Sequence, residues 1–218
     1  MKTMSANRCE WLDCAKGIAI LLVVLGHSFQ YYLYPDGFEN TLPWRIVYSF
    51  HMPFFFMLSG FSSGFSKYSK FSNFTLHKKI NRLVIPYFSW GLILFPISLF
   101  YRGWSWNLIT DFVVKPSHVG LWYLWTLFFI WLLHSLILRL FKGVGIRQLI
   151  CVIVWLTLIL FAYLTSGICC FNEISNYFVF YVIGFELCKN KLIRDCREMP
   201  KKVLNFSNEL IDNVIGIS

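Results

Sequence analysis

The chain has 218 residues, of which 57% are hydrophobic, 20% aromatic and only 14% charged. This composition is typical of a polytopic membrane protein and excludes an ordinary soluble domain. Twenty Lys and Arg against eleven Asp and Glu leave a formal net charge of +9. The basic residues stand at the ends of apolar segments, so they indicate orientation in a membrane rather than binding to nucleic acid.

Six apolar segments can cross a bilayer as helices, and they predict an all-α, polytopic membrane helix bundle. The predicted helices cover residues 17 to 34, 44 to 64, 83 to 101, 119 to 139, 147 to 166 and 174 to 188. The first segment lacks a convincing small-x-small cleavage site, which favours a retained helix over a signal peptide. We expect one domain spanning residues 1 to 218, with a basic cytoplasmic tail over residues 189 to 218.

The basic residues are divided unequally between the two sides of the membrane. When successive connections are assigned to alternate sides, one side keeps only Arg45, Arg102 and Lys115. Cytoplasmic connections carry the excess of Lys and Arg. Both termini are therefore predicted to be cytoplasmic.

The seven cysteines form no Cys-x-x-Cys pair and have no His/Cys ligand spacing. The sequence therefore predicts neither a zinc site nor a disulfide framework, and no metal is expected. We interpret the cysteines as packing or incidental thiols.

Lys16 and His27 lie on the first predicted helix, eleven positions apart. This spacing is three helical turns plus roughly 20°, which places both residues on one face, roughly 16 Å apart along the axis. An imidazole in hydrocarbon is costly unless it faces protein or water, so a functional role is one interpretation. The other is a histidine that only hydrogen-bonds a neighbouring helix.

The second predicted helix carries His51. His27 and His51 each lie about seven residues inside the outer end of their helices, so both are roughly 10 Å deep, and together they can border one pocket. Pro53 frees a carbonyl and can open room for a ligand. Small residues follow near the inner end of this helix, where close helix packing is favoured over catalysis; they are Ser59, Gly60, Ser62, Ser63 and Gly64.

Two stretches carry a resemblance to a known family. The first helix reads Asp-x-x-Lys-Gly-Ile from Asp13 and Val-x-Leu-Gly-His up to His27, and the second reads Phe50-His-Met-Pro-Phe-Phe-Phe-Met-Leu-Ser-Gly-Phe61. These motifs resemble the membrane-bound acyltransferase 3 family, most closely its branch similar to fucose 4-O-acetylases. The resemblance implies a bacterial inner-membrane enzyme that moves an acyl group from a cytoplasmic acyl-CoA to a sugar hydroxyl of an envelope glycan or glycolipid.

Lys79 and Arg82 precede the third predicted helix, three positions apart, so both can reach one anion. The family has Arg-x-x-Arg here, which the resemblance implies is part of the acyl-donor site. Lys79 keeps the charge but loses the bidentate fork of arginine. We expect acetyl-CoA to bind these residues as a donor rather than as a resident cofactor. Lys16 is expected beside the donor phosphates, oriented by Asp13 one turn earlier.

The fourth predicted helix opens with Trp122-Tyr123-Leu, which is similar to a signature of the family. Trp and Tyr commonly anchor a helix at the membrane interface. The resemblance favours a pocket in which they stack on a sugar ring. Together with Asp13, Trp122 and Tyr123 are the candidate substrate-binding residues.

Two chemistries remain open for the candidate catalytic residues His27 and His51. In the first, neutral His27 takes the proton of an acceptor hydroxyl as its oxygen attacks the thioester carbonyl. In the second, His27 carries a transient acyl group.

Two hypotheses other than an active enzyme also remain open. One is a transporter-like protein that moves a glycan or acyl group without bond chemistry. The other is an inactive truncated fragment, because the resembled family usually has more helices than this chain predicts.

Overall fold

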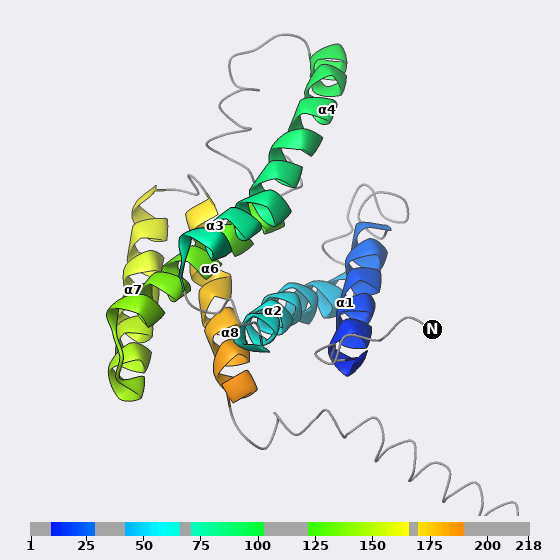
Figure 1. Ribbon diagram of the computed structural model, residues 1–218. Coiled ribbons are helices and arrows are strands. Elements are labelled where there is room, and N and C mark those ends of the chain that lie inside the picture. The colour runs from blue at the N-terminus through cyan, green and yellow to red at the C-terminus, as the bar shows by residue number, and fades with distance from the viewer. Residues whose placement is uncertain (1–9, 29–41, 66–70, 103–121, 166–169, 190–218) are drawn as a thin grey trace, which may run out of the picture. The chain divides into compact units, whose positions relative to one another are not determined.

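The computed structural model describes residues 10–28, 42–65, 71–102, 122–165 and 170–189, and helices account for nearly all of them (Figure 1). In chain order these helices are α1 (Glu10–Ser28), α2 (Leu42–Phe65), α3 (Asn73–Lys79), the π-helix η3 (Ile80–Val84), α4 (Ile85–Arg102), α6 (Trp122–Leu140), α7 (Val144–Thr165) and α8 (Phe171–Lys189). These segments contain no strand, so the predicted all-α class is confirmed.

The third predicted helix differs most from its prediction. It begins at Asn73 rather than at residue 83, because α3, η3 and α4 follow one another without a break. Ser72 starts it: the Ser72 hydroxyl accepts a hydrogen bond from the Thr75 backbone N–H at 3.2 Å. Hydropathy does not show this start, since a helix can begin in polar residues when a capping side chain satisfies its first N–H groups.

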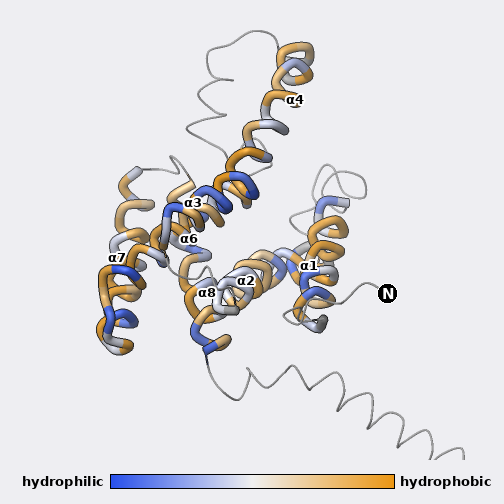
Figure 2. Tube along the Cα trace, viewed as in Figure 1, coloured by the Kyte–Doolittle hydropathy of each residue, from blue (hydrophilic) through white to orange (hydrophobic). Residues whose placement is uncertain are grey.

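Within the described residues, four helical stretches are long and apolar enough to cross a membrane, and they indicate a membrane protein. They are Trp11–Ser28, Asn73–Ile97, Trp122–Leu140 and Val144–Thr165. Figure 2 shows the hydrophobic residues along α4, α6 and α7 and the hydrophilic ones around α3. The helices α2 and α8 were also predicted to span but are not among these four stretches.

The chain forms two compact units. The first unit contains α1, α2 and the end of α8, because it comprises Met1–Gly64 and Gly184–Ser218. The second unit, Phe65–Ile183, contains α3, η3, α4, α6, α7 and the larger part of α8. The single-domain organisation stays a prediction.

In the first unit α1 and α2 run antiparallel. Near one end the rings of Trp11 and Phe61 meet with centroids 5.1 Å apart. Near the other end Gly26 lies against the Tyr48 side chain. The end of α8 packs on α2 through a small residue on each helix: Gly64 lies against Cys188, and Gly184 against the Met57 backbone. The packing role predicted for the small residues near the end of α2 is thus confirmed for Gly64.

In the second unit the continuous helix from Asn73 runs antiparallel to α6. Three contacts follow one another along the two helices: Arg139 lies over the Phe71 ring at 5.4 Å, Lys79 over the Trp131 ring at 5.5 Å, and Tyr87 meets Trp125 at a centroid distance of 5.2 Å. The helix therefore lies alongside α6 from Phe71 to Tyr87, and α4 continues past the start of α6 (Figure 1).

A hydrogen bond and a ring contact join the helix α7 to α8. The Trp155 indole N–H donates to the Ser175 carbonyl at 2.8 Å. The rings of Phe161 and Phe171 meet edge to face, with centroids 4.7 Å apart. An indole N–H that reaches a partner lets a tryptophan be buried between apolar helices without loss.

Candidate active-site residues

The two predicted catalytic histidines belong to the first unit and lie at the same end of the α1–α2 pair. The Gly26 contact with Tyr48 brings the residue before His27 to α2 one turn before His51. The two imidazoles are close enough to interact electrostatically. His27 is exposed, whereas His51 is buried with 3% of its surface accessible.

The tautomer of His51 follows from its surroundings. Its Nδ1 lies 2.7 Å from the Val47 carbonyl oxygen, and a carbonyl can only accept. In the neutral ring the proton is therefore on Nδ1, and Nε2 is the accepting nitrogen. The Tyr48 ring packs edge to face on the imidazole at a centroid distance of 4.7 Å and holds its orientation.

Lys16 lies near the opposite end of the same helix pair. Its ammonium donates a hydrogen bond to the Ser62 hydroxyl of α2 at 3.0 Å. Its partly buried side chain therefore ties α1 to α2. Asp13, one turn earlier, is exposed. Both residues belong to the first unit, whereas the predicted donor-binding pair Lys79 and Arg82 belongs to the second.

The Lys16 hydrogen bond gives a stability prediction. Lys16→Met keeps the apolar stem but removes the charged donor, a bond typically worth about 1.5–3 kcal/mol. A loss of about 2 kcal/mol lowers the Tm of a chain this long by roughly 4–8 °C. Thermal unfolding of the detergent-solubilised protein, followed by tryptophan fluorescence, measures the change.

Lys189→Met is the matched control for this prediction. Lys189 pairs with Glu186 at 3.9 Å near the end of α8, and both side chains are partly exposed. Such pairs contribute at most about 1 kcal/mol. Equal Tm values for Lys16→Met and the wild type would show that the Lys16 bond to Ser62 does not hold α1 on α2.

Lys79 and Arg82 lie at a π-helical turn. Lys79 is the last residue of α3, and Arg82 is in the middle of η3. The Lys79 ammonium lies over the ring of Trp131, a fully buried side chain of α6, while Arg82 is exposed. A π-helix winds more widely than an α-helix, and such turns often mark functional sites. The sequence predicted the pair but not this turn.

Basic residues predominate in the helices that precede and follow this turn along the chain. Along the chain, α3, η3, α4, α6 and α7 contain no Asp or Glu. The basic side chains described in these helices are Lys78, Lys79, Arg82, Arg139 and Arg147. Lys and Arg side chains attract polyanions such as phosphates.

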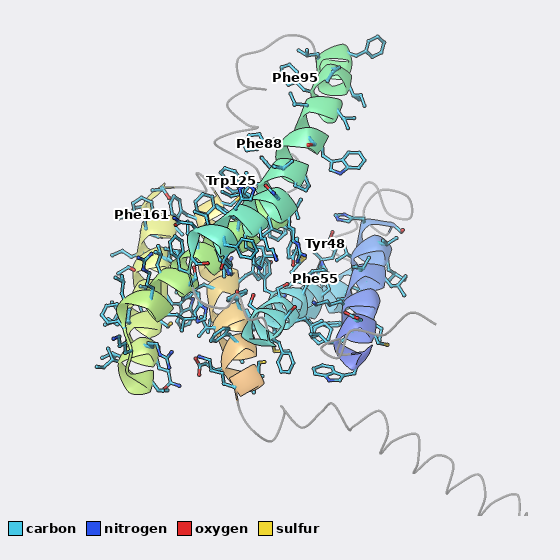
Figure 3. The ribbon with its side chains drawn as sticks, in the orientation of Figure 1. Tyr48, Phe55, Phe88, Phe95, Trp125 and Phe161 are labelled. Carbon is cyan, nitrogen blue, oxygen red and sulfur yellow. The ribbon has the colours of Figure 1, made fainter. Side chains whose placement is uncertain are left out.

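Trp122 and Tyr123 begin α6. The Trp122 ring stacks on Tyr177 of α8, with centroids 5.7 Å apart and planes 24° from parallel. The sequence did not identify Tyr177. Trp125, one turn into α6, meets Tyr87 and Phe88 of α4, as Figure 3 shows for Phe88 and Trp125. Aromatic rings from three helices therefore gather around the start of α6.

Among the described residues, three polar side-chain atoms in this aromatic region are buried and have no hydrogen-bond partner. They are Trp125 Nε1, Thr126 Oγ1 and Glu173 Oε2. Leaving such an atom unpaired typically costs about 1–3 kcal/mol, and more for a charged group. Glu173 was missed because it stands just before the predicted sixth segment, so its place in the first turn of α8 was not recognised.

Two observations concern metal and thiol chemistry in the described segments. They contain no group of three His, Cys, Asp or Glu residues that could hold a metal ion. Their four cysteines, Cys14, Cys151, Cys170 and Cys188, are not in disulfide bonds. Cys9, Cys169 and Cys196 lie outside the described residues.

The helices and side chains define an all-helical membrane protein with a histidine pair in one unit and a cationic turn beside aromatic rings in the other. Residues 10–195 match the acyltransferase domain of the acyltransferase 3 family. The chain belongs to this family.

Two nodulation proteins are similar to parts of the chain. Nodulation protein NolL of Mesorhizobium japonicum is 32% identical over 94 residues, which cover 42% of this chain and 25% of that protein. Nodulation protein NolL of Sinorhizobium fredii is 33% identical over 138 residues, which cover 60% of this chain and 37% of that protein. The chain thus spans a minor part of the length of these relatives. No solved structure matches it.

Proposed function

We propose that this protein is an inner-membrane O-acyltransferase that moves an acyl group, in the first instance acetyl, from acyl-CoA to a hydroxyl of an envelope glycan or glycolipid. The observation that carries the proposal is the pair of neighbouring imidazoles on α1 and α2, within a chain of the acyltransferase 3 family. Acyl transfer to a hydroxyl needs a base, and histidine holds or releases a proton near neutral pH.

His27 is the proposed general base. Its exposed imidazole is accessible to an acceptor hydroxyl, takes the hydroxyl proton, and lets the oxygen attack the thioester carbonyl. The carbon–sulfur bond then breaks, and the CoA thiolate leaves and is protonated. His51, with Nδ1–H bound to the Val47 carbonyl, presents Nε2 as a second proton acceptor. An acyl-imidazole on His27 is the alternative route.

The proposed donor site is the cationic turn of the second unit. Arg82 is exposed, and Lys79 is held above Trp131. The phosphates of acyl-CoA are polyanionic, so two cations on consecutive turns provide complementary charge. Lys79 keeps a point charge for this task, although it cannot form the two parallel hydrogen bonds of an arginine.

The donor site is tested by replacing both cations. Lys79→Ala with Arg82→Ala should weaken acetyl-CoA binding about tenfold or more, and the loss should shrink as salt rises, because screening removes the charge contribution. Lys142→Ala, which removes an exposed cation after α6, is the matched control and should bind normally. Titration of the purified protein with acetyl-CoA at two salt concentrations measures both. Unchanged binding by the double variant would exclude these residues from the donor site.

The function itself is tested by bond formation. Purified protein incubated with radiolabelled acetyl-CoA and envelope glycolipids should yield a labelled ester that mild alkali releases. A transporter-like protein moves its cargo without making this bond, so it gives no labelled ester. Absence of ester with every envelope glycolipid would overturn the proposed function.

A further inference from the structure

The start of α6 carries polar groups that the catalytic proposal does not use. Trp122, Trp125 and Thr126 are separated by three and four residues, so they share one face of the helix. On α8, Glu173 and Tyr177 are four residues apart and also share a face. The stacking of Trp122 on Tyr177 turns these two faces toward each other.

Several contacts place the same region against α4 as well. Tyr87 of α4 is 1% exposed, and its ring meets Trp125. It is also close enough to Cys170, the residue before α8, to interact with it electrostatically. The first turns of α6 and α8 therefore lie close to the side of α4. The three buried atoms without a hydrogen-bond partner, Trp125 Nε1, Thr126 Oγ1 and Glu173 Oε2, are on residues of these first turns.

The position of Glu173 in the first turn of α8 does not by itself account for the burial of its Oε2 atom without a hydrogen-bond partner. A carboxylate there interacts favourably with the helix dipole. That interaction does not supply donors to a buried Oε2. No Lys or Arg is present in residues 122 to 137 of α6 or 171 to 183 of α8, so neither stretch offers Glu173 an ion-pair partner. Thr126 is 0% exposed, and its hydroxyl too has no hydrogen-bond partner among the described residues.

The free groups define the chemistry of that partner. An indole N–H donates, a threonine hydroxyl donates or accepts, and a carboxylate oxygen accepts. A carboxylate disfavours phosphate or carboxylate ligands, since like charges repel. A sugar carries neighbouring hydroxyls that can both donate and accept hydrogen bonds, and the C–H face of its ring packs on an aromatic face. Ordered water can also form hydrogen bonds with the polar atoms, but it has no apolar face that packs on the stacked rings.

We propose that the Trp122–Tyr177 stack, together with Glu173, Trp125 and Thr126, binds a neutral sugar ring, with a sugar hydroxyl donating to Glu173 Oε2. The proposal rests on the proposed function, because it identifies the acceptor as a neutral, ring-containing glycan. It adds Glu173, Tyr177, Trp125 and Thr126 to the candidate substrate-binding residues.

Binding of sugars is measured without catalysis. The probes are methyl glycosides of a hexose, a 6-deoxyhexose and an N-acetylhexosamine, titrated onto the full protein in lipid nanodiscs and followed by saturation-transfer NMR. At least one glycoside should receive saturation at its ring C–H protons. Glu173→Gln and Trp122→Ala should each weaken its binding by about tenfold, equivalent to about 1.4 kcal/mol.

Two further variants separate binding from structural damage. Trp122→Phe keeps an aromatic ring on Tyr177 and should retain most of the affinity that Trp122→Ala loses. Glu186→Gln removes the other carboxylate of α8, which pairs with Lys189, and should bind the glycosides normally. All variants should elute as monodisperse protein with helical circular dichroism, since Gln has nearly the same shape as Glu.

The outcomes distinguish this site from the proposed function. If the wild type binds no glycoside, or if Glu173→Gln and Trp122→Ala bind as tightly as the wild type, the sugar site is overturned, even when labelled ester is formed. If the wild type binds glycoside and both variants lose affinity, the site stands, even when no ester is formed and the proposed function fails.

Discussion

Replacing His27 by alanine is expected to lower the rate of acyl transfer by about 10²- to 10⁴-fold, the usual contribution of a general base. The protein should remain at its normal level in the membrane, because the His27 side chain is exposed and is not part of the core. The initial rate of labelled-ester formation at saturating acetyl-CoA measures the effect. The amount of protein in the membrane fraction is measured beside it.

His77→Ala is the matched control for His27→Ala. His77 is also exposed, and its Nε2 lies 3.3 Å from the Asn81 amide nitrogen one turn later. At saturating donor its loss should leave the rate unchanged. His51→Gln should fall between the two, since a glutamine amide can still donate to the Val47 carbonyl but cannot accept a proton at neutral pH. Normal ester formation by His27→Ala would exclude His27 as the base.

The fold was largely predictable from apolar length. The observed α2 (Leu42–Phe65), α6 (Trp122–Leu140), α7 (Val144–Thr165) and α8 (Phe171–Lys189) agree within three residues with the predicted segments 44 to 64, 119 to 139, 147 to 166 and 174 to 188. The early starts at Glu10 and Asn73 were not predictable in this way, because hydropathy detects the part of a helix that suits hydrocarbon and not its polar first turns.

For the candidate site, the sequence indicates residues but not the contacts that they make. Equal depth predicted that His27 and His51 can border one pocket, and this stays a prediction; the two imidazoles are close enough to interact electrostatically. Helix spacing alone did not predict how α1 is rotated about its own axis, and this rotation directs the Lys16 side chain to Ser62. The stack of Trp122 on Tyr177 joins residues far apart in sequence, so no local pattern indicated it.

The π-helical turn at η3 (Ile80–Val84) had no signal in the sequence. Sequence spacing treats Lys79 and Arg82 as neighbours on an α-helical surface. The wider π-helical turn changes the angle between the two side chains, and the cation–π contact with Trp131 then fixes the position of Lys79. Such a contact is set by the packing of α6 on η3 and not by the order of residues.

Gly184→Ala is expected to produce the largest loss of stability. A Cβ at Gly184 would meet the carbonyl oxygen and carbon of Met57 in α2, which are backbone atoms and cannot turn aside as a side chain does. Close approach of this kind is how small residues join membrane helices. The helices must move apart, and overpacking typically costs about 1–3 kcal/mol, occasionally more. We expect a cost of about 3 kcal/mol for alanine and a larger one for valine, because the clash is with backbone.

Gly145 provides the matched control, because a Cβ there meets nothing within 4 Å at the start of α7. Gly145→Ala should stabilise the protein by about 0.5–1 kcal/mol, since alanine loses less conformational freedom in a helix. The yield of monodisperse protein and its Tm should therefore fall along the series Gly, Ala, Val at position 184 and stay level or rise for Gly145→Ala. A level series at position 184 would show that α8 does not approach the α2 backbone at Met57, because no relaxation of side chains alone can accommodate that methyl group.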